Sequence, residues 1–175
     1  EFKLNVKVHE PRVSYRETID HAVNATGGCH HRMIAGQAHT AELSIRMEPV
    51  AECAQPVVVT VAGGVSLPPE MLQAAIEVLQ ERGEGGGSLG FPLMKVKVTI
   101  TGGQAHETES NELAFRFAAA DAFEKALRDA GIVLLEPVMR LEVTTPEDSV
   151  GDIVGDLQQR RALIQRTHVR GETTV

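Results

Sequence analysis

The residue best placed for chemistry in this chain is His106, within the segment Gly102-Gly103-Gln104-Ala105-His106-Glu107. Paired glycines followed by a lone histidine predict a stiff loop that presents an imidazole at its tip. A histidine can act as a general base, but a base needs a nucleophile and an orienting partner, and the neighbouring residues supply no fixed triad. A second candidate is His39, in the segment Ala35-Gly36-Gln37-Ala38-His39-Thr40. A free-standing α/β hydrolase that uses either histidine therefore stays open as an alternative.

Two groups of residues have the chemistry of metal ligands. Cys29-His30-His31 combines a thiol with imidazoles, but adjacent side chains point in different directions and a tetrahedral zinc site needs spaced pairs. We therefore interpret it as a polar connector between strands. Glu107, Glu109 and Glu112 could hold a hard cation, although acidic residues before a helix are already explained by the helix dipole. We predict no metal site.

A glycine-rich loop, Gly83-Glu84-Gly85-Gly86-Gly87, could suggest a phosphate cradle. It lacks the lysine and the Ser/Thr of a P-loop, and it precedes a predicted strand where a P-loop precedes a helix. We therefore expect no nucleotide site and no cofactor in this chain.

Composition narrows the classes of protein. At 175 residues and 42% hydrophobic, the chain can form one or two domains. Tryptophan is absent and aromatic residues make up 3%, which favours a mixed α/β core of aliphatic side chains over an aromatic platform for base stacking. The net charge of -7 argues against a free-standing nucleic-acid binder, so any contact with RNA must be local or guided by other domains.

Cysteine spacing and hydropathy indicate the compartment. Cys29 and Cys53 show no disulfide framework, and no signal segment or membrane-length apolar run is evident. We therefore expect a cytoplasmic protein with no membrane contact. The chain begins without methionine, which suggests a fragment of a longer protein.

Hydrophobic periodicity predicts the elements of a first unit. Alternation over residues 3–8 and 12–23, and again over 41–47, predicts strands, of which the last two form an antiparallel pair joined by a polar stretch at 24–32. The β-branched run 57–61 predicts a central strand buried on both faces. A helix from Pro69 to Gly83, a strand over 93–100 and a helix capped by Ser110 and ending at Gly131 follow.

A second unit is expected after Gly131. Alternation over 139–143 predicts a strand, and Val150, Ile153, Val154 and Leu157 define one face of a helix. Because the chain ends soon afterwards, we expect this apolar face to pack against the first unit or a neighbouring copy, so the fragment could self-associate.

Several strings carry a family resemblance. They are Tyr15-Arg16-Glu17-Thr18-Ile19, Ser110-Asn111-Glu112-Leu113-Ala114-Phe115, Leu134-Leu135-Glu136-Pro137-Val138-Met139 and Gly151-Asp152-Ile153-Val154-Gly155-Asp156-Leu157. In their order and spacing, which span nearly the whole chain, they resemble the C-terminal half of bacterial elongation factor G, the translocation GTPase.

This resemblance implies both fold and role. Residues 1–131 would be the fourth domain, a ribosomal-protein-like α/β fold with a left-handed β-α-β crossover, where physics alone favours the right-handed form. Residues 132–175 would begin a ferredoxin-like fifth domain. The fourth domain is the arm that reaches the decoding site of the small ribosomal subunit, so the partners would be rRNA and the tRNA–mRNA pair. GTP and Mg²⁺ would bind in an N-terminal domain absent here, and the fragment itself would be no enzyme.

The resemblance also assigns contact residues. Gly102, Gly103, Gln104, Ala105, His106 and Glu107 match one tip loop of the arm, in which His106 corresponds to a histidine modified in eukaryotes. A short side chain on a stiff loop suits a place beside a phosphate or sugar. Gly36, Gln37 and His39 match the other tip loop, where most glycines and an arginine of the family are missing. This departure favours a divergent paralogue, and a role in ribosome recycling is the alternative. Arg160 and Arg161 would contact rRNA, or simply stabilise a helix end.

Overall fold

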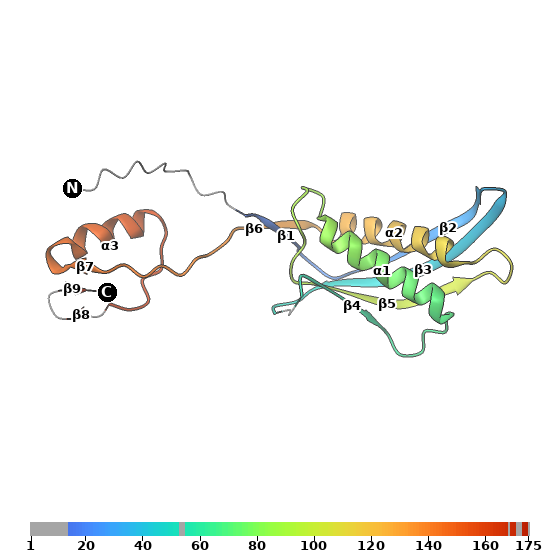
Figure 1. Ribbon diagram of the computed structural model, residues 1–175, viewed down its shortest axis with the longest axis horizontal. Coiled ribbons are helices and arrows are strands. Elements are labelled where there is room, and N and C mark those ends of the chain that lie inside the picture. Colours follow the sequence, from blue (N-terminus) through green and yellow to red (C-terminus); the bar gives the residue numbers. More distant parts are fainter. Residues whose placement is uncertain (1–13, 53–54, 168, 171–172, 175) are drawn as a thin grey trace, which may run out of the picture. The chain divides into compact units, whose positions relative to one another are not determined.

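The computed structural model describes residues 14–52, 55–167, 169–170 and 173–174 (Figure 1). The strand predicted over residues 3–8, the start of the next at 12–13, and Cys53 lie outside these ranges. The chain divides into two compact units, residues 1–137 and 138–175. The predicted mixed α/β class is confirmed.

The first unit is built on a four-stranded sheet covered on one face by two helices. The strands lie in the order β2 (Val23–Ile34), β3 (Gln37–Pro49), β5 (Val96–Ala105) and β4 (Val57–Val61). The first three are antiparallel, whereas β4 runs parallel to β5, to which α1 (Pro69–Gly85) connects it. Helix α2 (Glu112–Asp129) packs on β2 and β3 beside α1 (Figure 1).

The core lies between the sheet and the helices. Alternate residues of β3 and β5 are fully buried: Leu43, Ile45, Met47, Val96, Val98 and Ile100. Opposite them α2 presents mostly alanine, with Phe115 and Phe123 as its large buried side chains. The small residues let the backbones approach closely: a Cβ on Gly27 of β2 would lie 2.1 Å from the backbone N of Ala122.

A two-stranded ribbon lies near the C-terminal ends of α1 and α2 (Figure 1). Strand β1 (Arg16–Ile19) pairs antiparallel with β6 (Ile132–Leu135), so that Arg16 lies opposite Leu135. Glu17 of β1 is fully buried. Its carboxyl group accepts hydrogen bonds from the backbone N–H of Leu89, at 3.1 Å, and of Phe91, at 2.7 Å. The string Tyr15 to Ile19 therefore anchors the glycine-rich loop after α1.

The structure corrects the prediction of a polar connector over residues 24–32. These residues form most of β2, and β2, not the segment 12–23, pairs with β3. The alternation in this strand is carried by the buried small residues Ala25, Gly27 and Cys29. Small side chains give a weak periodic signal because the helix backbone packs directly on them.

Two further strand predictions are wrong. β4 is an edge strand of its sheet, with Val61 39% exposed, and it is not buried on both faces. Residues 139–143 form no strand, and among the described residues no strand pairs with them. Met139 and Leu141 are exposed, so the alternating pattern there lacks the buried face that a strand requires.

The described part of the second unit forms a short three-stranded sheet and the helix α3. The sheet has the order β7 (Thr145–Pro146), β9 (Thr173–Thr174), β8 (Val169–Arg170), and a turn of 3₁₀ helix, η1 (Glu147–Ser149), leads into α3 (Val150–Gln159). The predicted helix at 150–157 is confirmed, and its four apolar side chains are half-buried. The packing of this apolar face against the first unit or a neighbouring copy stays a prediction. The domain boundary at residue 131 also stays a prediction; β6, which follows it, pairs with β1 of the first unit.

Candidate functional site

Two connections meet at the end of the first unit opposite the ribbon, and we call this end the tip (Figure 1). One is the turn between β2 and β3, formed by Ala35 and Gly36. Both have positive φ, 50° and 81°, as the tight turns of two-residue hairpins require. Gly36 and Gln37 are exposed; Gly36 lies in the turn, and Gln37 is the first residue of β3.

The other connection, between β5 and α2, is shorter than predicted. Residues 102–105 are not part of a loop but continue β5 along β3, after a bulge at Thr101. A Cβ on Gly103 would lie 2.8 Å from the carbonyl oxygen of Glu42, so close strand packing accounts for this glycine. Gln104, Ala105, His106 and Glu107 are exposed, and the loop itself begins at His106.

Hydrogen bonds join the two connections. The hydroxyl of Thr40 donates to the carboxylate of Glu109 at 2.5 Å, and the backbone N–H of Thr40 donates to the carbonyl of Glu109 at 3.0 Å. The hydroxyl of Ser110 donates to the carbonyl of Thr40 at 2.5 Å and accepts from the backbone N–H of His106 at 2.7 Å. We call Thr40, Glu109 and Ser110 the clasp.

The electrostatics of the clasp centre on Glu109. The hydrogen bond from Thr40 lowers the pKa of its carboxyl group, partial burial acts in the opposite direction, and His31, 3.3 Å away, lowers it further. The carboxylate is therefore held in its charged, hydrogen-bond-accepting form. The helix dipole, which the sequence suggested as the reason for this acid, is only part of its role, because Glu109 lies before α2 and binds β3.

His106 is exposed beside the clasp. The backbone N–H of Thr108 donates a long bond, 3.4 Å, to its Nδ1 atom. With Nδ1 as an acceptor, the neutral ring carries its proton on Nε2. Nε2 makes no hydrogen bond within the described part of the chain, so it can donate to a partner.

The structure corrects the prediction that Ser110 caps α2. The N-cap is Asn111, whose Oδ1 atom accepts from the backbone N–H of Ala114 at 2.9 Å, and Ser110 belongs to the clasp. His39 is only 4% exposed, and its Nδ1 atom accepts from Nδ2 of Asn111 at 2.9 Å. In this structure the ring supports the cap from inside, and a direct contact of His39 with RNA stays a prediction.

Comparison with known proteins decides the family. The family model described as "Elongation factor G, domain IV" matches residues 11–131, and the one described as "Elongation factor G C-terminus" matches residues 133–175. The chain belongs to the elongation factor G family. It is thus a relative of translation elongation factors, which act in protein biosynthesis.

Individual relatives agree with this assignment. Elongation factor G of Thermotoga neapolitana is 37% identical over all of this chain and 25% of its own length. Elongation factor G of Petrotoga mobilis is 40% identical over 94% of this chain and 24% of its own length. A crystal structure of a Thermus thermophilus protein superposes with a TM-score of 0.79 at 36% identity, covering 94% of this chain and 24% of that chain. The chain spans about a quarter of the length of these relatives.

Cys29, which has the chemistry of a metal ligand, lies in β2 of this elongation factor G relative. Its thiol donates to the backbone carbonyl of His39 at 3.4 Å. Burial raises the pKa of that thiol, against a smaller opposing effect of Arg32, so the reactive thiolate is disfavoured. Among the described residues, no three His, Cys, Asp or Glu side chains are grouped as metal ligands.

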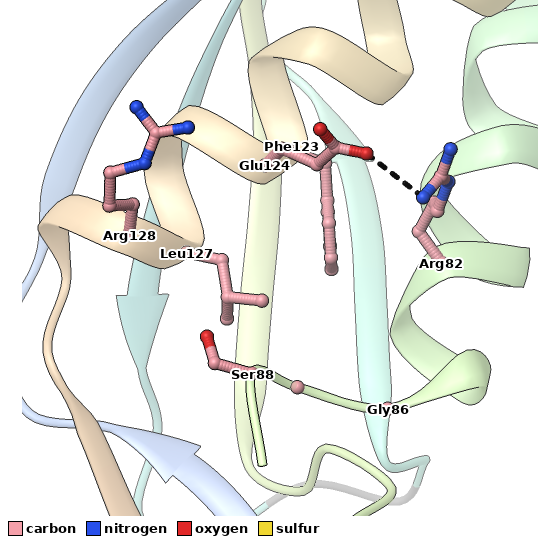
Figure 2. Close-up of a pocket in the computed structure, with 8 residues that line it drawn as sticks. Arg82, Gly86, Ser88, Phe123, Glu124, Leu127 and Arg128 are labelled. Carbon is pink, nitrogen blue, oxygen red and sulfur yellow. Dashed lines mark hydrogen bonds and ion pairs between the residues drawn. The ribbon is translucent and has the colours of Figure 1, made fainter. Parts of the chain in front are cut away.

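A cavity of about 380 Å³ lies at the other end of the helices, beside the glycine-rich loop (Figure 2). Phe123 and Leu127 give it an apolar side, and Arg82 pairs with Glu124 at 3.0 Å across its rim. Arg82 and Arg128 lie in the last turns of α1 and α2, where positive charge is favourable to the helix dipole. Helix stabilisation therefore accounts for both arginines.

In the second unit, Arg160 and Arg161 follow α3 and are exposed. Arg160 pairs with Asp156 at 2.8 Å, and Arg161 has a positive φ of 60°. The ion pair binds Arg160 to the last turn of α3. Contact of Arg160 and Arg161 with rRNA stays a prediction. Within the described ranges, no helix has the length and apolar character to span a bilayer.

Gly36, Gln37 and the segment 104–107, which the family resemblance assigns to tip loops, lie at one end of the first unit. The hydrogen bonds that hold them together were not predicted. Thr40 had no predicted partner, and Ser110 was predicted to cap the following helix. A hydroxyl residue just inside a hairpin, and an acid before a helix, are too common to indicate a pair that is 69 residues apart in sequence.

Proposed function

We propose that this chain is the ribosome-contacting arm of an elongation factor G-type factor that promotes translocation of the tRNA–mRNA pair. The tip would enter the decoding region of the small subunit, and residues 1–131 would form the fourth domain, with the fifth beginning at residue 132. The observation that carries the proposal is the exposed His106, on a loop that the clasp binds to the neighbouring hairpin. Membership of the elongation factor G family supports the same role.

The mechanism would be steric, with position more important than charge. The chain has a net charge of -7, so attraction to RNA phosphates cannot drive its binding as a whole. A fixed imidazole that offers an Nε2–H donor can instead meet a phosphate or sugar oxygen once other domains have placed the arm. An arm in the vacated decoding site would then block the reverse movement of tRNA and mRNA.

The remaining expectations follow from this role. GTP and Mg²⁺ would bind in a separate domain of the complete factor, which would be the GTPase and would act in the cytoplasm. Arg160 and Arg161 would contact rRNA through the second unit.

Replacing His106 with Ala in the complete factor tests the proposal. Loss of a hydrogen bond in the contact should slow single-round translocation roughly 10- to 100-fold, while GTP hydrolysis per ribosome stays nearly unchanged. Glu84→Ala is the control, because Glu84 is exposed in the last turn of α1 and has no assigned contact. Normal translocation by the His106 variant contradicts the proposal, and an equal loss of GTP turnover indicates misfolding or coupling through the whole factor.

One observation favours a second candidate, a paralogue that acts in ribosome recycling. The hairpin of the tip closes with a two-residue turn, and Arg32 beside it lies over the ring of Phe117 at 4.3 Å. Most of the glycines and the arginine that the family resemblance leads us to expect are missing from this hairpin connection. A subunit-splitting assay of the complete factor distinguishes the roles: splitting without translocation would favour recycling.

A further inference from the structure

We propose that the clasp residues Thr40, Glu109 and Ser110 position His106 for its contact. This inference deepens the proposed function and rests on it. Without the clasp, the loop from His106 to Ser110 would be joined to β5 and α2 only through the backbone at its two ends. The clasp adds lateral bonds to the turn-side end of β3, so the two connections of the tip move as one body.

The position of Thr40 explains why a hydroxyl is needed there. Its Oγ1 atom donates to Glu109 at 2.5 Å and accepts from the backbone N–H of His31 at 3.0 Å. His31 lies at the bulge of β2 and has a positive φ of 44°. Its N–H is therefore not part of the regular backbone pairing between β2 and β3. One hydroxyl therefore joins the bulge of β2, strand β3 and the loop before α2. Valine has the same shape and makes neither bond, whereas serine makes both.

Ser110 carries the connection on to the histidine. Its hydroxyl accepts from the backbone N–H of His106 and donates to the carbonyl of Thr40, and its own N–H donates to the carbonyl of His106 at 3.1 Å. The backbone of His106 is thus held on both its N–H and its C=O. Since two backbone groups of one residue are fixed, the direction in which its side chain leaves the loop is fixed as well.

The clasp is separate from the core that holds the fold. The side chain of Glu109 is 26% exposed, and Thr40 and Ser110 are half-buried, whereas the large side chains between sheet and helices are fully buried. The backbone ladder between β2 and β3 on either side of the bulge, and the cap at Asn111, are formed by groups other than the Thr40 hydroxyl. Removing that hydroxyl should therefore loosen the loop without unfolding the unit.

The experiment compares Thr40→Val with Thr40→Ser in the complete factor. Thr40→Val removes both bonds of the hydroxyl but leaves the imidazole of His106 in place. It should therefore slow single-round translocation roughly three- to tenfold, less than His106→Ala does, with GTP hydrolysis unchanged. Thr40→Ser should restore the rate. Amide hydrogen exchange of the 175-residue chain should show faster exchange at His106 and Ser110 in the valine variant only.

A double-mutant cycle shows whether the clasp acts through His106. If it does, adding Thr40→Val to His106→Ala slows translocation no further. Additive losses, or a serine variant as slow as the valine variant, would overturn the inference. The proposed function fails separately, when His106→Ala alone has no effect; a slow His106→Ala with a normal Thr40→Val leaves that function standing and rejects the clasp.

Discussion

Each end of the first unit holds a loop by means of one glutamate, and the two glutamates are bound in different ways. Glu17, at the ribbon end, is fully buried and accepts from the backbone N–H groups of Leu89 and Phe91. Glu109, at the tip, is 26% exposed and accepts from the side chains of Thr40 and His31.

The two glutamate contacts should therefore differ in how well they tolerate mutation. Backbone donors are present whatever the sequence of the loop, and a buried carboxyl group has no water to replace them, so the Glu17 contact tolerates little change. The donors at the tip are side chains within reach of water. They can be exchanged by mutation without leaving buried polar groups unpaired, so the tip can diverge in sequence while the fold persists.

The largest effect is expected from Glu17→Ala. It leaves two backbone N–H groups without acceptors and opens a cavity beside Leu93, which should lower the free energy of unfolding by about 3 kcal/mol or more. Urea unfolding of the 175-residue chain measures this, with Glu107→Ala, exposed at the tip, as the control. A loss below about 1 kcal/mol would show that water replaces the carboxyl group, and the contrast between the two ends would disappear.

A smaller effect is expected from Gly87→Ala, which disturbs the same anchor from the other side. The new Cβ would lie 2.0 Å from Oε2 of Glu17, so the carboxyl group must move away from its donors. We expect a loss of about 1–3 kcal/mol in urea unfolding, as for other overpacked sites. Gly85→Ala is the matched control, because a Cβ there meets no atom within 4 Å at the end of α1. Equal stability of the two variants would mean that the loop shifts freely and that Glu17 does not fix it.

The smallest effect concerns pH and the tip. Because the pKa of Glu109 is lowered in the folded chain, chiefly by Thr40, its contribution is fully present above its unfolded pKa, ordinarily about 4.3. That contribution is lost as the pH falls through the folded value. The stability difference between the natural chain and Glu109→Gln should therefore shrink from pH 5 to pH 3, a range below that in which histidines ordinarily titrate. Urea midpoints at both pH values test this; a constant difference would mean that the charge of Glu109 does not contribute.

Sequence patterns predicted the elements that have a large apolar face. Helix α2 was found because Phe115 and Phe123 recur at helical spacing, and α3 because its four apolar residues do. β2 was missed because its buried positions are small, and β4 was misplaced because a β-branched run looks the same at an edge as at the centre. At the tip, the family resemblance located the exposed residues. It could not show that the side chain of His39 is buried or that Thr40 binds Glu109, since both depend on the register between β3 and β5 and on the bulge at Thr101.

The ribbon of β1 and β6 has a mechanical consequence. Arg16 lies opposite Leu135, so the strands at both ends of the described part of the first unit lie side by side. Tension applied between residues 15 and 136 would separate Arg16 from Leu135 first. It would then reach Glu17, whose backbone also bonds to Pro92 and Met94 and whose carboxyl group binds the loop. A sideways load on the tip would instead reach the ribbon through the sheet and both helices, which form one packed body. The unit is therefore a stiff lever whose attachment yields at its outermost residue pair and is held at Glu17.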